Sequence, residues 1–375
     1  MTMNWCQNCV LPDTRPNLEL DDYGICNACR NNHDKKEIKW TQRQLELQSV
    51  VANAKTHSSG YDCLIPVSGG KDSTWQTVKC LELGLKPLTV TWRPPGRTVI
   101  GQRNLDNLIR LGVDHIDYTI NPAVEARLML KTFERLGSTG IPMHLALFNI
   151  PLTIASRFRI PLVIWGENSA FEYGNNKSAD IGFALDENWL RTYGVTHGTT
   201  ASDWIDDEIT EKDLTPYFGP GDNELQIARV KAIFLGYYLP WDPETSRSIA
   251  SRHGFEAKED GPRTGYFNYA DIDDEFISLH HWLKWYKFGF TRTYDNLSIE
   301  IRNGRMTRNQ AIEIIRELED ETPYKDIEQF CNFSGIKKSK FMEIAERFRN
   351  HNIWKQDANG IWYIDNFLIN DWKWS

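Results

Sequence analysis

The sequence lacks the features of an exported or membrane-spanning protein. Its first residues show no basic segment followed by an apolar one, as a signal peptide requires. No run of about 18 apolar residues occurs, and the most apolar stretch, residues 145–155, is interrupted by Asn149 and Pro151. The sequence therefore predicts a cytoplasmic protein without a membrane span.

An excess of basic residues is also absent. The chain of 375 residues carries 43 lysines and arginines against 51 aspartates and glutamates, a formal net charge of −8. Proteins that bind nucleic acid mainly through electrostatics usually present a basic face, so this balance argues against nucleic acid as a partner. With 41% hydrophobic and 25% charged residues, the composition is that of a soluble globular protein.

Cysteines are few, and only four of the seven are regularly spaced. Cys6-x-x-Cys9 and Cys26-x-x-Cys29 form two pairs, an arrangement typical of a structural zinc site with four thiolate ligands and no open position. An iron–sulfur cluster or disulfides are the alternatives, and disulfides conflict with a cytoplasmic address. Because residues 1–40 have few aliphatic side chains, we expect the metal to hold them together.

Apolar and amphipathic runs alternate between residues 41 and 168. A polar helix is expected over 41–56. Strands that alternate with helices predict a parallel sheet with helices on both faces. The predicted strands cover residues 61–67, 85–92, 113–120 and 160–168, and the predicted helices cover residues 71–83, 104–112, 123–136 and 144–158.

The changes in pattern along the chain divide it into three expected domains. Residues 1–40 form the cysteine-rich unit, which resembles a zinc ribbon, and residues 41–245 form the α/β domain. Residues 170–230 lose the alternating pattern and are predicted to be an insertion or a lid. Residues 246–375 are predicted to be a helical domain with a tryptophan-rich tail.

One turn places unusual polar chemistry between an apolar strand and a helix. It reads Ser68-Gly69-Gly70-Lys71-Asp72-Ser73. At such a place the helix dipole and free backbone N–H groups favour an anion, and glycines allow the backbone a close approach. The turn matches neither the Walker A pattern nor G-x-G-x-x-G. It resembles the PP-loop, S-G-G-x-D-S, of ATP pyrophosphatases. A glycine-rich turn with incidental polarity is the alternative.

The PP-loop resemblance implies how this turn works. PP-loop enzymes cleave ATP between the α- and β-phosphates and bind pyrophosphate in the loop. All six residues of the turn are therefore predicted to bind ATP. Lys71 and Asp72 are predicted to be catalytic, with Asp72 as a carboxylate for Mg²⁺ or for a donor group of the substrate.

The end of the second strand is the next candidate for contact with the nucleotide. In the PP-loop superfamily this end meets the adenine, and here it consists of Thr91, Trp92 and Arg93. These three residues are predicted to bind ATP. For Arg93, a position facing solvent is the alternative.

A later strand ends in a polar turn with a predicted role at the same edge. Parallel sheets bind ligands at the carboxyl ends of their strands, so Gly166, Glu167 and Asn168 are expected to face the nucleotide. Glu167 is predicted to be catalytic and to hold Mg²⁺ or the substrate, and Asn168 to bind the substrate. A helix-capping turn is the alternative.

Nearly the full chain resembles the N-acetyl sugar amidotransferase family. The resemblance rests on the four-cysteine unit and on the blocks PVSGGKDSTW, VIWGEN, LGYYLPWD, HHWLKWYKFGFTRTYD and IEIRNGRMTRNQAI, and it is least clear over residues 170–230. It implies an ATP-dependent enzyme that converts an acetamido group of a bacterial surface-polysaccharide sugar into an acetamidino group. The reaction passes through an O-adenylyl imidate, which ammonia attacks as AMP leaves.

A glutaminase motif is missing from this chain. No cysteine stands in G-x-C-x-G, and Thr2 occupies the position where a class II glutaminase carries its cysteine. The resemblance therefore implies separate partners, a glutaminase and a cyclase-like subunit that delivers ammonia. It also implies an N-acetylated sugar substrate that is nucleotide-linked or nonulosonic.

The basic and aromatic blocks of the C-terminal part contain the predicted substrate ligands. Lys287, Arg292 and Arg302 are assigned to the substrate, since arginine forks suit carboxylate and phosphate groups. A solvated face of an amphipathic helix is the alternative. Either His280 or His281 is a candidate base, although histidines in a core or on a helix surface are more common.

Two other functions compete with sugar amidation. The first is tRNA modification by a PP-loop enzyme of the thiolation or lysidine type. Thiolases usually carry a reactive cysteine near the loop, whereas Cys63 and Cys80 fall within the adjoining strand and helix, where core packing is expected. The second is a binding protein with an inactive loop, against which the intact motif argues.

Overall fold

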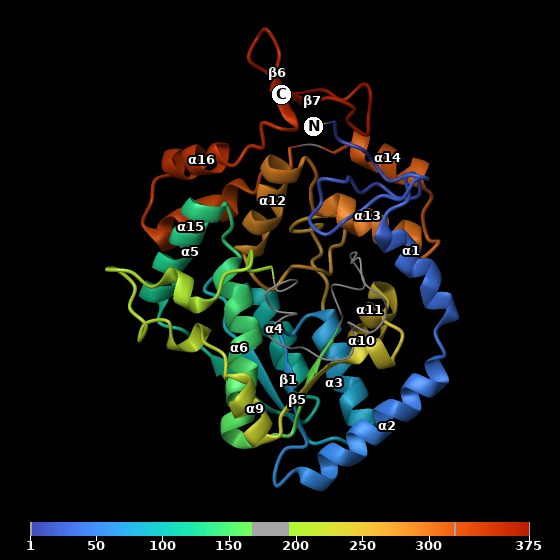
Figure 1. The fold of residues 1–375 in the computed structure, drawn as a ribbon, viewed down its shortest axis with the longest axis vertical. Coiled ribbons are helices and arrows are strands. Elements are labelled where there is room, and N and C mark those ends of the chain that lie inside the picture. The colour runs from blue at the N-terminus through green and yellow to red at the C-terminus, as the bar shows by residue number, and fades with distance from the viewer. Residues whose placement is uncertain (1, 167–194, 319, 375) are drawn as a thin grey trace.

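The computed structural model describes residues 2–166, 195–318 and 320–374 of the chain. A parallel sheet of five strands lies at its centre, in the order β3-β2-β1-β4-β5 (Figure 1). The chain runs outward from β1 to β3 and then returns to the other side of β1. The strands are β1 (Cys63–Pro66), β2 (Pro87–Trp92), β3 (Asp114–Tyr118), β4 (Leu162–Trp165) and β5 (Lys231–Phe234).

Helices cover both faces of this sheet, as the alternating pattern predicted. One face packs against side chains of α2 (Trp40–His57), α3 (Lys71–Glu82) and α4 (Val99–Ile109). The other face packs against α5 (Pro122–Leu136) and α6 (Ile141–Phe158). Strands β1, β2 and β4 are mostly buried on both sides, which explains why they are mainly apolar rather than alternating. The edge strand β3 is partly exposed and carries Asp114, His115 and Asp117.

Part of the region expected to be an insertion or a lid joins the second face. Residues 195–217 contain two short helices, η3 (Ala201–Trp204) and η4 (Thr215–Tyr217), and their buried side chains extend the core beside α6. Helix α9 (Asp222–Ala228) then leads into β5. The rest of the predicted insertion, residues 170–194, lies outside the described residues.

The C-terminal part is mostly helical, as predicted. It begins with α10 (Leu235–Tyr238) and α11 (Pro243–Arg252), which packs against α3. Residues 253–276 form neither helix nor strand and cross the top of the sheet (Figure 1). The remaining helices are α12 (Ile277–Phe288), α13 (Arg292–Arg302), α14 (Arg308–Arg316), α15 (Tyr324–Ser334) and α16 (Lys338–Arg347).

The prediction of helix to the end of the chain is wrong for its last part. Strands β6 (Trp354–Gln356) and β7 (Trp362–Ile364) form an antiparallel hairpin. Gly360 has a positive φ of 81° in the connecting turn. The turn sequence Asn359-Gly360 between aromatic runs is a hairpin signal, which the sequence analysis did not use.

The two ends of the chain share a hydrophobic core. The N-terminal segment, including its four cysteines and α1 (Asn27–Asp34), packs against α13, α14 and the residues after β7 (Figure 1). The Trp5 ring stacks on Tyr294 with centroids 5.8 Å apart, and its indole N–H donates to the Asn366 carbonyl oxygen at 2.9 Å. The cysteine-rich unit is thus supported by helices almost 300 residues away in sequence.

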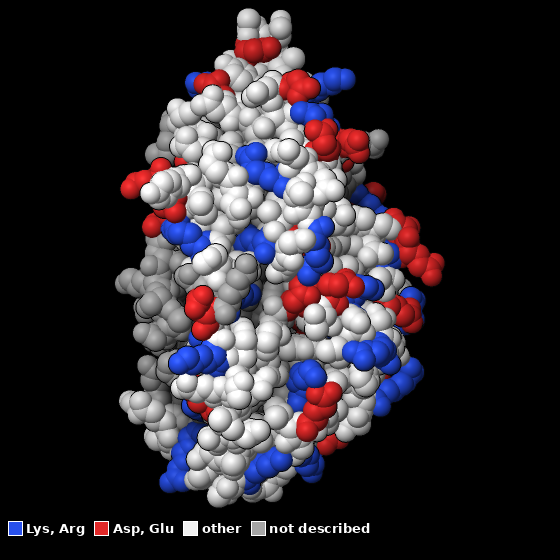
Figure 2. Space-filling view, turned by 90° about the vertical axis from the view of Figure 1, so that its right-hand side faces the viewer, with Lys and Arg blue, Asp and Glu red and all other residues white. Residues whose placement is uncertain are grey.

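No described helix has the length and apolar composition needed to cross a lipid bilayer. Figure 2 shows Lys and Arg side chains interspersed with Asp and Glu side chains on one face of the molecule, without a large area of one sign. This distribution agrees with the mixed charge of the sequence.

Candidate functional site

The PP-loop, residues 68–73, lies where the strand order reverses. It connects β1 to α3, and β1 has β2 on one side and β4 on the other. Helix α3, which leads from β1 to β2, lies on one face of the sheet, whereas α5 and α6, which precede β4, lie on the other, so the carboxyl end of β1 opens into a crevice. Open α/β sheets bind ligands at this position.

Side-chain hydroxyls hold the loop in shape. The Ser73 hydroxyl accepts a hydrogen bond from the Gly69 N–H at 3.1 Å and donates to the Gly70 carbonyl at 3.0 Å. The Ser68 hydroxyl accepts from the Gly70 N–H at 3.2 Å. Both serines thus have structural partners in the loop. A bound anion would compete with these internal bonds for the backbone N–H groups.

Gly69 is required by both its conformation and its surroundings. Its φ is +88°, in the region that favours glycine. A Cβ at this position would lie 2.5 Å from the backbone nitrogen of Leu105 in α4, which cannot move as a side-chain end can. The close approach of α4 therefore excludes any larger residue.

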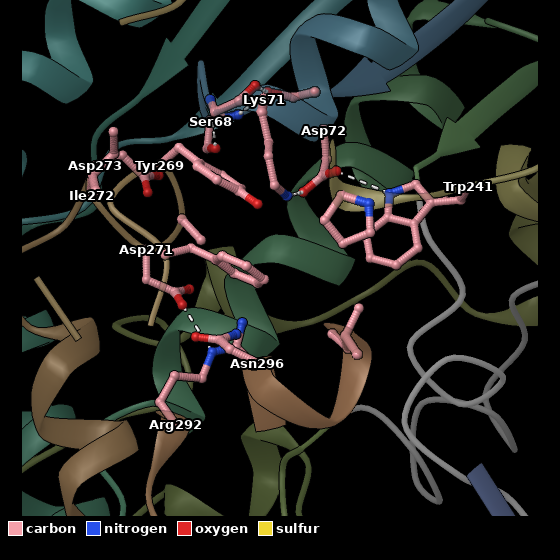
Figure 3. A pocket seen from close by; sticks show the side chains of 16 residues that line it. Ser68, Lys71, Asp72, Trp241, Tyr269, Asp271, Ile272, Asp273, Arg292 and Asn296 are labelled. Atoms are coloured by element: carbon pink, nitrogen blue, oxygen red, sulfur yellow. Dashed lines mark hydrogen bonds and ion pairs between the residues drawn. The ribbon is translucent and has the colours of Figure 1, made fainter. Parts of the chain in front are cut away.

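Lys71 and Asp72 point toward each other at the start of α3. Their charged groups form an ion pair, and the other oxygen of Asp72 accepts from the Trp241 indole N–H at 2.9 Å (Figure 3). The Lys71 ammonium lies 5.8 Å from the Trp241 ring centroid and 6.0 Å from that of Tyr269. Only 7% of Lys71 is exposed, so aromatic rings and one carboxylate hold its charge in place.

A cavity of about 180 Å³ opens directly above the loop. Its opposite wall comes from the C-terminal part of the chain, and the side chains from both parts point into it (Figure 3). Of this wall, only Arg292 was predicted from the sequence to belong to the site. The residues that the prediction missed are Trp241, Tyr269, Asp271, Asp273 and Asn296. The dense acidic run at 270–275 was the available signal.

Residues 271–276 are fastened to the sheet region beside α4. The Thr98 hydroxyl donates to the Ile272 carbonyl at 2.6 Å, and the Thr98 N–H donates to the Asp273 carbonyl at 3.0 Å. A Cβ on Gly101 would lie 2.8 Å from the Asp273 carbonyl oxygen, so glycine allows this close packing. The C-terminal wall is therefore held firmly against the domain that carries the PP-loop.

The carboxylates of this wall differ in their electrostatic surroundings. Burial opposes ionisation of Asp271, but Arg292, with Nε 2.9 Å from the carboxylate, and His281 outweigh it and lower the pKa of Asp271 below its usual range. Burial raises the pKa of Asp273 despite its hydrogen bond with Ser68. Asp271 is thus ionised in the folded protein. A cation bound in the cavity would favour the ionised form of Asp273.

The predicted adenine contacts at the end of β2 do not line this cavity. The Thr91 hydroxyl donates to the Val67 carbonyl at 2.6 Å. The Trp92 indole donates to Glu125 at 2.9 Å inside the core, where burial raises the pKa of that carboxyl to about 8. Arg93 lies 3.4 Å from Asp117, and half of its side chain is exposed.

The turn after β4 is described only at its first residue. The Gly166 carbonyl accepts from the Gly236 N–H at 2.9 Å, and a Cβ on Gly166 would lie 3.1 Å from the Gln76 side-chain oxygen. Glu167 and Asn168 lie outside the described residues. Their predicted roles as catalytic and substrate-binding residues stay predictions.

The three predicted substrate ligands do not lie together, and only one of them lines the cavity. Arg292 lines the cavity, whereas Arg302 stands at the other end of the 11-residue helix α13 and does not. Lys287 belongs to a buried group on α12, where burial lowers its pKa to about 8. In the same group the Lys284 ammonium pairs with the Asp295 carboxylate at 2.9 Å.

Both candidate histidines are buried beside this group. Burial and nearby cations lower the pKa of His280, and they lower that of His281 to about 4. The His281 ring nitrogen lies 3.6 Å from Asp271, which lines the cavity. Each histidine is therefore neutral near pH 7, and His281 lies next to the cavity wall.

The four spaced cysteines meet in one buried cluster. Their sulfur atoms all lie within 4.8 Å of one another, and the closest pairs are Cys9 with Cys26 at 3.7 Å and Cys6 with Cys29 at 4.0 Å. A tetrahedral zinc ion with Zn–S distances of about 2.3 Å needs sulfurs about 3.8 Å apart. The donor set fits zinc in number, kind and spacing.

Backbone groups support this cluster. The N–H groups of Cys9 and Cys26 donate to the Cys6 sulfur at 3.4 and 3.3 Å. The Arg308 guanidinium of α14 donates to the carbonyls of Cys6 and Cys9 at 3.2 and 3.0 Å. A positive charge thus lies beside ligands that would be negative as thiolates. Cys63 and Cys80 are buried in the sheet region, as expected.

One family model matches part of the chain. Residues 263–367 match the family "LPS biosynthesis protein WbpG-like, C-terminal domain", in agreement with the resemblance drawn from the sequence. None of the curated proteins compared with the chain matches it.

Two solved structures are among those similar to the chain. An NMN synthetase from Francisella tularensis is 13% identical, with a TM-score of 0.37, over 80% of this chain and 94% of that one. A predicted subunit of tRNA methyltransferase from Methanocaldococcus jannaschii is 14% identical, with a TM-score of 0.29, over 50% of this chain and 75% of that one.

Proposed function

We propose, with the match of residues 263–367 to a lipopolysaccharide-biosynthesis family as the premise, that the chain is an ATP-dependent amidotransferase. It converts an acetamido group of a bacterial surface-polysaccharide sugar into an acetamidino group and releases AMP and pyrophosphate. One observation carries this proposal: the PP-loop and the family-matched segment line the same cavity. A site for ATP and a part typical of lipopolysaccharide synthesis therefore face each other.

The chain's own residues fit the first half of this reaction. The acetamido oxygen attacks the α-phosphorus of ATP, the bond to the β-phosphate breaks, and pyrophosphate leaves into the PP-loop. The backbone N–H groups at the start of α3 and the Lys71 ammonium face the negative charge that develops there. Asp72 and Asp273 offer carboxylate oxygens of the kind that Mg²⁺ prefers, and a bound Mg²⁺ would share the phosphate charge.

The second half of the reaction needs a nucleophile and a fixed acceptor. The acetamido nitrogen gives up its proton when the neutral imidate forms. Ammonia then attacks the imidate carbon and the carbon–oxygen bond to AMP breaks. Two of the ammonia protons stay on the new nitrogen and the third moves to the imidate nitrogen, which gives the amidinium product. Arg292 supplies positive charge on the acceptor side, since it lines the cavity. Lys287 stays a predicted substrate ligand, although it does not line this cavity. The ammonia comes from separate glutaminase and cyclase-like subunits.

The reaction is tested with the purified chain, ATP, Mg²⁺, ammonium and a panel of acetamido sugars. AMP release and sugar mass are followed together. We expect AMP to appear in step with the replacement of one sugar oxygen by NH. The matched control is Asp260→Asn, an exposed carboxylate outside the cavity, which should keep full turnover. AMP release that requires tRNA and a sulfur donor would instead support the tRNA-modifying alternative.

The source of ammonia is tested separately. Ammonium should support turnover by the chain alone, whereas glutamine should support it only after a glutaminase partner is added. Turnover with glutamine by the pure chain would refute the assignment of this step to a partner and leave the sugar chemistry unaffected.

A further inference from the structure

A second and larger cavity lies in the C-terminal part, and the proposed reaction leaves it unused. Its volume is about 420 Å³, within the range of small-molecule sites. It shares no lining residue with the cavity above the PP-loop. Helix α13 separates the two, because Tyr294 faces this cavity whereas Arg292 and Asn296 face the other.

Aromatic rings form most of its walls. Trp285 of α12 and Trp374 of the tail stack with centroids 6.4 Å apart, and Trp354 of the hairpin stands nearly perpendicular to both. Trp362 and Trp372 complete the walls. In an ordinary hydrophobic core, other side chains would pack against these rings, since an unfilled apolar cavity lowers the stability of the fold. The open space therefore indicates a ligand that covers flat apolar faces.

Several polar groups of the cavity have unused hydrogen-bonding capacity. Within the described residues, nothing accepts from the indole N–H groups of Trp285, Trp362 and Trp374, all of which are partly exposed. By contrast, the Trp354 indole donates to the Tyr286 carbonyl at 3.1 Å. The carboxylate of Glu321 accepts from the Thr293 hydroxyl at 2.7 Å and also interacts with Thr291. A carboxylate has about four lone-pair positions, so it can still accept from a ligand. The ligand therefore needs both acceptors and donors.

The charges in the lining cancel. Asp320 and Glu321 contribute two negative charges, and Arg349 and Lys373 contribute two positive ones. The guanidinium of Arg349 is already stacked on Tyr286 and on two tryptophan rings. The protein's own arginine therefore occupies the ring faces that would otherwise bind a cationic ligand. A basic peptide would add charge without a free anionic partner, and a phosphate would meet two carboxylates.

We propose that this aromatic cavity binds a neutral pyranose ring. A pyranose presents apolar C–H faces that stack on indoles, while its hydroxyls accept from indole N–H groups and donate to Glu321. Residues 263–367, which supply most of the walls, match a lipopolysaccharide-biosynthesis family, and neutral sugars are among the building blocks of such polymers. The site is additional to that of adenylyl transfer and does not depend on the amidotransferase reaction.

The test uses the full chain with N-acetyl-D-glucosamine, D-glucose and D-galactose as probes. Binding is followed by tryptophan emission and by saturation-transfer NMR, with and without saturating MgATP. We expect at least one sugar to give a saturable change at millimolar concentration that MgATP leaves unchanged. Trp362→Ala should weaken binding about fivefold to tenfold, the size of one lost aromatic contact.

Two further variants guard against a folding defect. Glu321→Gln keeps the shape of the wall and should also weaken sugar binding, because one acceptor oxygen becomes an NH2 donor and the negative charge is lost. Trp40→Ala removes a fluorophore at the start of α2, outside the cavity, and should leave the affinity unchanged. The proposal is overturned if no probe binds, if MgATP displaces the sugar, if Trp40→Ala weakens binding equally, or if an arginine-rich peptide binds the cavity and the sugars do not.

Discussion

The PP-loop and the four-cysteine unit are both built from short sequence motifs, but they differ in how many contacts they make with distant parts of the chain. The PP-loop is shaped by its own serines and held by β1 and α3, its neighbours in sequence. The cysteine unit packs against α13 and α14, at the far end of the chain. Damage to the loop should therefore stay local, whereas damage to the cysteine unit should spread to a wall of the cavity.

A buried ion pair links the cysteine unit to the helix that lines the cavity. Arg15, between the two cysteine pairs, donates to the fully buried Asp295 of α13 at 2.9 Å. The other oxygen of Asp295 pairs with Lys284 of α12 at 2.9 Å. Arg292 and Asn296 on the same helix line the cavity. The cysteine unit thus contributes to the position of residues at the candidate site.

Removal of the predicted zinc ion should have the largest effect. Structural zinc in small sites contributes on the order of 10 kcal/mol of folding free energy. After chelation or in Cys9→Ser, we expect amide exchange to accelerate in residues 2–30 and also in α13. Hydrogen-exchange mass spectrometry measures both. Fast exchange in the cysteine unit with unchanged α13 would break the proposed coupling.

Asp72→Asn should have the opposite profile, with a large loss of activity at nearly unchanged stability. Its carboxylate accepts from Trp241 and pairs with Lys71 at the cavity, so its charge is expected to matter for the bound nucleotide. We expect AMP formation to fall about 100-fold or more. Denaturant unfolding should show a change below about 1 kcal/mol. Full turnover would show that the site is misplaced.

Gly69→Ala should destabilise the loop region by about 3 kcal/mol, from backbone strain and the clash with Leu105. Gly112→Ala is the matched control, because Gly112 also has a positive φ, +96°, but a Cβ there meets no atom within 4 Å. Thermal unfolding of both variants separates clash from strain. Equal losses would mean that the close approach of α4 contributes nothing.

Arg15→Gln should cost about 2 kcal/mol of unfolding free energy. The change leaves Asp295 buried with fewer positive partners. Arg30→Gln, which alters a partly exposed pair with Asp21 in the same unit, should cost less than about 1 kcal/mol. Bound zinc is measured in both variants, since the prediction for Arg15 requires that the metal content stay the same.

The last prediction concerns the pH dependence of stability, for which the expected change per unit of pH is smaller than the loss in Arg15→Gln. Burial lowers the pKa of His144, His197 and His281 to about 4, so their stabilisation is lost as pH falls from about 6.5 toward 4. Burial raises the pKa of Glu125 to about 8, so its contribution is lost as pH rises above about 4.5. The histidines and Glu125 thus change the stability in opposite directions as pH rises.

Glu125→Gln removes the contribution of Glu125. It should steepen the rise of unfolding free energy between pH 5 and 7 by up to about 1.4 kcal/mol per unit of pH. An unchanged slope would contradict this.

The parallel sheet, the PP-loop and the four-cysteine motif were predicted from local patterns in the sequence. The strand and helix positions between residues 61 and 165 follow from alternating runs, and the predicted helices and strands were found. The hairpin at 354–364 was missed because three-residue strands have too little periodicity to stand out from a helical context. The division of domains at residue 245 stays a prediction.

The sequence by itself determined the PP-loop, the four thiolates and the parallel sheet, because each arises from residues near one another in the chain. Only the tertiary structure decided which residues face the loop. Trp241, Asp271 and Arg292 stand about 170 to 220 positions after the loop, and no local pattern encodes their approach. Their place depends on the packing of residues 271–276 beside α4 and of α13 against the cysteine unit. Such long-range contacts are set by the burial of shared surfaces, which appears only when the whole chain has folded.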